Sequence, residues 1–139
     1  MYIYGVLKNS NEELTDIHNL FNQIYQDTEK WEPSKHEGNT IYAVVYEKNQ
    51  AVAAGAIVFQ DYDKAQITQV FVQEEKRGQK YGDMALRMLL THAFQKGINR
   101  VNAFPNSKTT GFFVKMGFLK TENGYAIEEK DFIPPCHRK

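Results

Sequence analysis

The sequence predicts a single α+β domain in which a mixed, mostly antiparallel β-sheet carries helices on it. Three observations lead to this prediction. Strand-like segments joined by short turns fill the middle of the chain, amphipathic segments with helical spacing lie before and after them, and no repeat or linker interrupts the 139 residues. A chain of this length suits one ordinary domain, so we take residues 1–139 as one unit.

The N-terminal half is expected to hold one helix among four strands. Residues 2–7 alternate loosely and predict a first strand. Ser10 and Glu13 stand at the spacing of a capping box, which predicts a helix over about 11–27. Its apolar face is formed by Leu14, Ile17, Phe21, Ile24 and Tyr25. The three further strands are predicted at 41–46, 51–60 and 65–72, with turns at 48–50 and 61–63.

The C-terminal half contains the clearest helical period in the sequence. Ala85, Leu86, Leu89, Leu90 and Ala93 form an apolar stripe, and Gly97 stands where a C-terminal cap belongs. The remaining elements are a strand at 100–104, a short helix from Asn106 to Gly117, and strands at 118–119 and 125–128. The predicted order is β-α-β-β-β-α-β-α-β, and the ending FIPPCHRK offers one more strand.

Composition removes several classes of protein. There are 17 Lys and Arg against 17 Asp and Glu, so no net positive charge favours nucleic acid. No apolar run approaches the roughly 20 residues of a membrane span, and the first residues do not resemble a secretory signal. The lone Cys136 forms no internal disulfide and supplies no zinc site, so we expect no metal. We expect a soluble, cytoplasmic protein.

The segment 70–86 joins a β-branched strand to an amphipathic helix through a turn that contains Gly78 and Gly82. Such a turn can direct several backbone N–H groups, at the positive end of a helix dipole, toward one phosphate or diphosphate. Lys76, Arg77 and Lys80 add positive charge. By spacing alone, a solvated connection explains the turn equally well. The sequence lacks the endings of a nucleotide P-loop and of a dinucleotide-binding loop.

This turn resembles the acetyl-CoA-binding motif of the GNAT N-acetyltransferase superfamily, Arg/Gln-x-x-Gly-x-Gly/Ala, which maps onto residues 77–82. Lys80 replaces the middle glycine, which either adds a cation or narrows the approach of the main chain. A second block, residues 106–118, resembles the segment Asn-x-x-Ala-x-x-Phe-Tyr-x-Lys-x-Gly-Phe of the same family. It departs from the pattern at Thr109 and Phe113.

The resemblance implies acetyl-CoA as cofactor and a defined set of binding residues. Main-chain groups of the strand would pair with the pantetheine arm, the turn would hold the pyrophosphate, and the second block would wall the cofactor. These residues are Val70, Val72, Arg77, Gly78, Gln79, Lys80, Tyr81, Gly82, Asp83, Asn106, Phe112 and Phe113. For the two phenylalanines, a place in the core is an equal alternative.

The implied reaction is direct transfer of an acetyl group to an amine in a ternary complex, which needs a base and an acid. The N–H of Val72 would polarise the thioester carbonyl. Phe113 lacks the hydroxyl that relatives use as the acid, and Gln66, Thr68 and Gln69 offer no base. Tyr125 and His137 are the alternative candidates, and ordered water is a third.

The acceptor is expected to be an amine of a small molecule or a peptide. The resemblance implies an acceptor pocket after the first helix, where residues 31–36 (WEPSKH) lie, but a solvated loop with one aromatic anchor is the slightly favoured interpretation of that segment. The rival hypothesis is a GNAT-fold module that binds or senses acyl-CoA without turnover. Nucleic acid and membrane are not expected partners, and a homodimer is kept as an alternative to a monomer.

Overall fold

The computed structural model describes residues 2–9, 11–26, 39–61 and 63–132. In chain order the helices and strands are β1 (Ile3–Asn9), α1 (Thr15–Tyr25), β2 (Thr40–Glu47), β3 (Gln50–Asp61), β4 (Lys64–Val72), α2 (Tyr81–Gln95), β5 (Arg100–Ala103), α3 (Thr110–Lys115), β6 (Leu119–Lys120) and β7 (Tyr125–Glu128). Short 3₁₀ turns follow β4 at Glu74–Lys76 and β7 at Glu129–Asp131.

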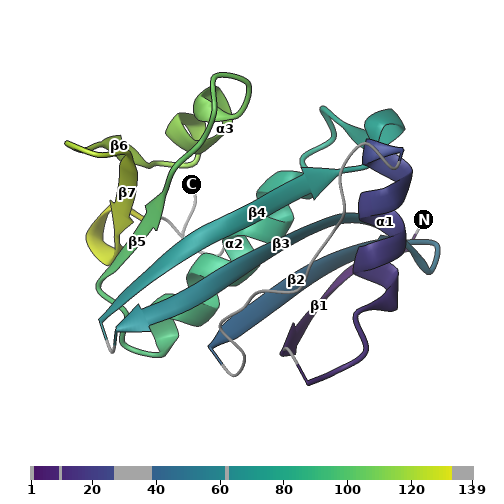
Figure 1. Cartoon of the computed structure of the whole chain (residues 1–139), viewed down its shortest axis with the longest axis horizontal. Coiled ribbons are helices and arrows are strands. Elements are labelled where there is room, and N and C mark those ends of the chain that lie inside the picture. Colours follow the sequence, from purple (N-terminus) through teal and green to yellow (C-terminus); the bar gives the residue numbers. More distant parts are fainter. Residues whose placement is uncertain (1, 10, 27–38, 62, 133–139) are drawn as a thin grey trace.

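The described strands form one seven-stranded sheet in the order β1-β2-β3-β4-β5-β7-β6. Among them, only β4 and β5 run parallel, so the predicted mixed and mostly antiparallel sheet is confirmed. Helix α1 lies on one face of the sheet and α2 on the other (Figure 1). Each helix covers its own apolar cluster, so the sheet separates two cores.

A β-bulge in β4 changes which side chains face which helix. Ile57 of β3 pairs with Ile67, but its neighbour Ala56 pairs with Gln69, so Thr68 is an extra residue in β4. Before the bulge, Ile67 belongs to the core beneath α2. After it, Phe71 belongs to the core beneath α1, because the inserted residue reverses the alternation.

Two predicted boundaries are confirmed by backbone conformations that only certain residues adopt readily. The β2–β3 hairpin turns at Lys48 and Asn49, whose φ angles are 52° and 66°. Helix α2 ends before Gly97, which has a φ of 92° and lets the N–H of Ile98 reach the carbonyl of Ala93 at 3.1 Å.

Two predicted helix starts are wrong, and in both cases an asparagine side chain holds a turn instead. Helix α1 begins at Thr15 rather than near 11, because the Asn9 side chain accepts a hydrogen bond from the N–H of Asn11 at 2.9 Å. Helix α3 begins at Thr110, since the Asn106 side chain accepts bonds from the next residues and forms a turn there. Ser10 and the predicted last strand lie outside the described residues.

Helix α1 is attached to the sheet by a polar contact as well as by apolar packing. The hydroxyl of Tyr46 in β2 donates a hydrogen bond to the carboxylate of Asp16 at 2.7 Å. Burial and this carboxylate raise the pKa of Tyr46, so the phenol stays protonated further into the alkaline range and continues to donate the bond there.

In the part of the chain that the structure describes, none of the helices combines the length and the apolar character that crossing a membrane would require.

Leu89 and Leu119 provide a matched test of where the core lies. Leu89 lies on α2 with its side chain fully buried in the core between this helix and the sheet, whereas Leu119 on β6 is 61% exposed. We expect Leu89→Ala to lower the free energy of unfolding by about 2–5 kcal/mol through lost burial and a cavity. Leu119→Ala should change it by less than about 0.5 kcal/mol. Chemical denaturation measures both, and equal losses would contradict this placement of the core.

Candidate functional site

Strands β4 and β5 separate partway along their length, and this separation creates an open place in the sheet (Figure 1). The two strands pair only from Lys64 and Arg100 to Ile67 and Ala103. Beyond Ile67, β4 continues to Val72 and stays paired with β3 alone among the described strands. The separation begins at the Thr68 bulge, so no strand that the structure describes lies along one edge of the second half of β4.

The backbone of Val70 and Val72 faces this open edge. The N–H of Gln73 bonds to the carbonyl of Val52 in β3 at 2.8 Å. Backbone groups of successive strand residues point to opposite edges, so those of Val72 and Val70 point away from β3. The Val72 carbonyl accepts a bond from the Arg77 side chain at 3.2 Å, which leaves its N–H directed into the gap.

The turn between β4 and α2 ends in a row of backbone N–H groups beside this gap. Within the described chain, the N–H groups of residues 78–83 make no backbone–backbone hydrogen bond, and the next, that of Met84, bonds to the carbonyl of Lys80. The first turn of a helix has unpaired N–H groups and carries the positive end of the helix dipole. This row can therefore bind a phosphate or diphosphate, which is the fit that the sequence predicts for the cofactor.

Lys80 adopts the backbone conformation of the glycine that it replaces. Its φ and ψ are 69° and 18°, in the left-handed region, and it precedes the first residue of α2. The main-chain path of the turn is thus kept, at a conformational cost of about 1 kcal/mol. The side chain of Lys80 is exposed, so of the two alternatives the added cation is the one that this conformation favours.

Gly82 brings three of the predicted binding residues together. A Cβ at this position would lie 3.1 Å from Cγ2 of Val72 and 3.6 Å from the ring of Phe112. The end of β4, the first turn of α2 and helix α3 therefore meet at this residue, which has room for no side chain without displacement of its neighbours.

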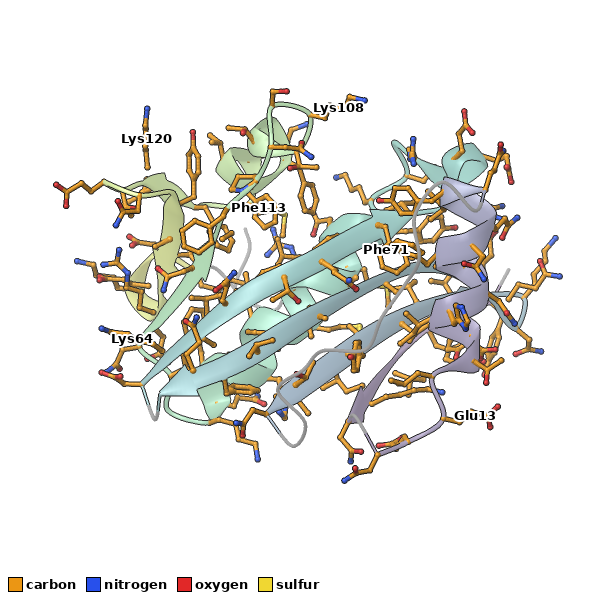
Figure 2. All side chains as sticks on the ribbon, viewed as in Figure 1. Glu13, Lys64, Phe71, Lys108, Phe113 and Lys120 are labelled. Atoms are coloured by element: carbon orange, nitrogen blue, oxygen red, sulfur yellow. The ribbon has the colours of Figure 1, made fainter. Side chains whose placement is uncertain are left out.

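The two phenylalanines of the second block lie in different surroundings. Phe112 is half-buried and reaches toward Gly82, whereas Phe113 is buried in the core against Phe118, with ring centroids 5.1 Å apart. Figure 2 shows Phe113 on α3 and Phe71 on β4 next to α1, on either side of the separation. Asn106 is exposed, and its side-chain oxygen holds the turn before α3.

The charged side chains of the turn have different partners. Lys76 pairs with Glu47 at 2.5 Å, and Asp83 pairs with Arg87 at 2.6 Å. Tyr81 points inward and its hydroxyl also reaches Glu47. Sequence reasoning missed Glu47, although a carboxylate at the end of the apolar strand TIYAVVYE is a signal that could have found it.

The candidate acids are only partly placed. Tyr125 is half-buried in β7 and pairs with Ala103, so β5 separates it from β4. His137 and residues 31–36 lie outside the described residues. His92 of α2 contacts Phe59 of β3, and burial lowers the pKa of His92, which makes it a neutral side chain away from the gap.

A groove of about 520 Å³ runs along the other side of α2, next to Leu7 of β1, and its lining mixes apolar side chains such as Met84 and Met88 with polar and charged ones. Lys80 and Asp83 reach its end. It lies on the β1 side of α2, away from the β4–β5 gap, so we do not assign the site to it.

Replacing Lys80 with glycine should relieve the strained conformation. We expect Lys80→Gly to raise the free energy of unfolding by about 1 kcal/mol, because glycine adopts positive φ without steric cost. Lys96, at the end of α2 with a φ of −85°, is the matched control, and Lys96→Gly should give no gain. Chemical denaturation measures both variants, and a loss of stability in Lys80→Gly would refute the strain.

Residues 9–118 of the chain match the Acetyltransferase (GNAT) family. Among curated proteins, none matches the sequence. The fold is similar to that of Escherichia coli ElaA, with 18% identity, a TM-score of 0.72, and coverage of 91% of this chain and 97% of that one. It is also similar to the ribosomal-protein-S18-alanine N-acetyltransferase of E. coli (11% identity, TM-score 0.71, 91% and 94% covered). A third similar structure is the PaiA N-acetyltransferase of Thermoplasma acidophilum in complex with coenzyme A (15% identity, TM-score 0.67, 91% and 97% covered). The chain therefore belongs to the GNAT acetyltransferase family, whose acyl donor is acetyl-CoA.

Proposed function

We propose that this chain transfers an acetyl group from acetyl-CoA directly to the amine of a small molecule or a peptide, within a ternary complex. The observation that carries the proposal is the row of backbone N–H groups at residues 78–83, which lies beside the open edge of β4. If the diphosphate binds at this row, the pantetheine arm attached to it would extend along Val72 and Val70. Their backbone groups are directed into the gap and can pair with it as a further strand would.

In this proposal the N–H of Val72 donates a hydrogen bond to the carbonyl oxygen of the thioester. The amine attacks the carbonyl carbon, negative charge develops on that oxygen, and a fixed N–H donor stabilises it. When the carbonyl forms again, the C–S bond breaks and coenzyme A leaves as a thiolate, which the acid protonates. Val72 is well fixed, because its strand pairs with β3 and its carbonyl is held by Arg77. Gly82 keeps the space beside Val72 free of a side chain.

The part of β4 next to the gap has polar but uncharged side chains. Gln66 accepts a hydrogen bond from Gln60 at 2.9 Å, and Thr68 is exposed at the bulge. Neither can take a proton from an ammonium at neutral pH. We propose that the acid is Tyr125 or His137 and that ordered water carries the proton away from the amine.

A module that binds acyl-CoA without turnover is the second candidate. The observation that favours it is Phe113, which lies where relatives place a tyrosine and is buried in the core. A non-catalytic module would need the phosphate-binding turn but not the acidic hydroxyl that Phe113 lacks.

Calorimetric titration with acetyl-CoA, followed by a thiol-release assay over a panel of amines, separates these candidates. The panel should contain small amines and peptides with a free N-terminus. Binding with thiol release on an amine supports the transferase. Binding without release on every amine favours the non-catalytic module, and absence of binding would refute both.

Gly82 tests the placement of the cofactor. We expect Gly82→Val to weaken binding of acetyl-CoA by about 100-fold or more, because its side chain would push against Val72 and Phe112 where the strand and helix meet. Gly111 on α3 is the matched control, since a Cβ there meets no atom of the described residues within 4 Å. Calorimetry on both variants gives the affinities, with thermal unfolding to confirm folding. An affinity within a few-fold of the parent for a folded Gly82→Val would contradict the placement.

Tyr125→Phe and His137→Ala test the two candidate acids. We expect the substitution that removes the acid to lower kcat by about 100-fold while KM for acetyl-CoA is retained, because only proton transfer is lost. Tyr4→Phe is the control, since that hydroxyl bonds to Asn49 in the β2–β3 turn. If both variants keep the parental kcat, neither residue is the acid.

A further inference from the structure

Glu47 is a buried carboxylate for which the proposed reaction has no use. It ends β2, and its side chain is 7% exposed. Among the described residues, Thr40 and Glu47 are the buried polar or charged side chains, so Glu47 is the buried carboxylate of this part of the chain. Burial of a charge is costly unless the charge is fully paired.

Each oxygen of this carboxylate has its own partner. The Tyr81 hydroxyl donates to Oε2 at 2.5 Å, and Nζ of Lys76 lies 2.5 Å from Oε1. Glu47 is on the face of β2 that α2 covers, because Val45, two residues earlier, belongs to the core beneath α2. The carboxylate therefore lies directly under the start of that helix.

The two partners stand immediately before and after the phosphate-binding turn. Lys76 ends the 3₁₀ turn after β4, and Tyr81 is the first residue of α2. Between them lie residues 77–80, which include the positive φ angles of Gly78 and Lys80. One carboxylate thus joins both ends of a short segment that has an unfavourable backbone conformation and few other described contacts.

We infer that Glu47 is a positioning residue, which fixes both ends of the turn so that the N–H groups of residues 78–83 point at one place before the coenzyme binds. The inference rests on the proposed function, because the ligand of the turn is the diphosphate of acetyl-CoA. In this arrangement Lys76 pairs with Glu47 and holds the turn, and Arg77 and Lys80 are the cations nearest the ligand. A site whose donors are fixed in advance avoids the entropy of ordering them on binding.

The protonation states of the three groups are consistent with this role. The bonds from Lys76 and from Tyr81, in that order, hold the pKa of Glu47 below its ordinary value, and the charge of Lys48 acts in the same direction. The bond to Glu47 raises the pKa of Lys76, with a contribution from Glu75, and raises that of Tyr81. A lowered carboxyl pKa means that the interaction is complete above the ordinary value and is lost as the pH falls through the lowered one. At neutral pH it is therefore complete.

Tyr81→Phe tests the inference with no change of charge, because it removes one hydroxyl and leaves Lys76 paired with Glu47. Tyr46→Phe is the matched control. It removes a second tyrosine–carboxylate bond, to Asp16, on the other face of β2. Two measurements are needed: hydrogen exchange of the coenzyme-free protein, and calorimetric affinity for acetyl-CoA.

In the coenzyme-free protein, we expect Tyr81→Phe to speed exchange about tenfold at the amides of Arg77 and Met84, which bond to carbonyls at either end of the turn. The affinity for acetyl-CoA should fall about tenfold. Tyr46→Phe should instead speed exchange at the amide of His18 in α1 and leave the affinity unchanged.

Glu47→Gln separates positioning from simple repulsion. If the carboxylate only repels the diphosphate, its neutralisation frees Lys76 and tightens binding, which would overturn the inference. If it holds the turn, binding weakens even though the site gains positive charge.

The other results of the exchange and affinity measurements also test the inference. Unchanged exchange at Arg77 and Met84 in Tyr81→Phe overturns the inference whatever the affinities are. Faster exchange with an unchanged affinity overturns the role in coenzyme binding. A parent protein that binds no acetyl-CoA refutes the proposed function itself, and the exchange data then show separately whether Glu47 holds the turn.

Discussion

The separation of β4 from β5 at the Thr68 bulge is the constraint on which the rest of the site depends. One extra residue in β4 coincides with the end of its pairing with β5 and reverses the side-chain alternation. Phe71 can then pack under α1 while Val70 and Val72 pack toward α2. A regular strand would continue along β5 and use its backbone groups there. Beyond the bulge these groups have no described partner strand on that edge, while β3 holds the other edge of β4.

The second constraint is the conformation of the turn that follows. The N–H groups of residues 78–83 remain available because a helix cannot bond its own first turn, and because Gly78 and Lys80 turn the chain sharply before α2. Such a turn stays in place only when its surroundings determine it. Gly82 packs it against Val72 and Phe112, Arg77 ties it to β4, and Glu47 joins its two ends.

The sequence predicted the strands from 41 to 72 and the helix that ends at Gly97 because periodicity and glycine caps are local signals. The predicted starts of α1 and α3 were wrong because the side chains of Asn9 and Asn106 form turns where the helices were expected to begin. The site was predicted unevenly. The glycines and cations of the turn singled it out, and the family resemblance, not their spacing, predicted that it binds the cofactor. The pairing of Lys76 with Glu47 joins residues far apart in the chain, and nothing near Lys76 in the sequence indicates it.

The proposed site is built from backbone groups, which is consistent with a fold shared at 11–18% identity with similar structures. Backbone N–H groups are supplied by every residue except proline, so diphosphate binding constrains chain conformation rather than side-chain identity. Lysine can then stand at position 80 in the conformation of the usual glycine, provided that the surrounding contacts offset its strain. Proton transfer, in contrast, needs particular side chains. The cofactor turn of this chain was therefore predicted from a short motif, whereas no motif in the sequence predicted the side chains that would bind the acceptor or move its proton.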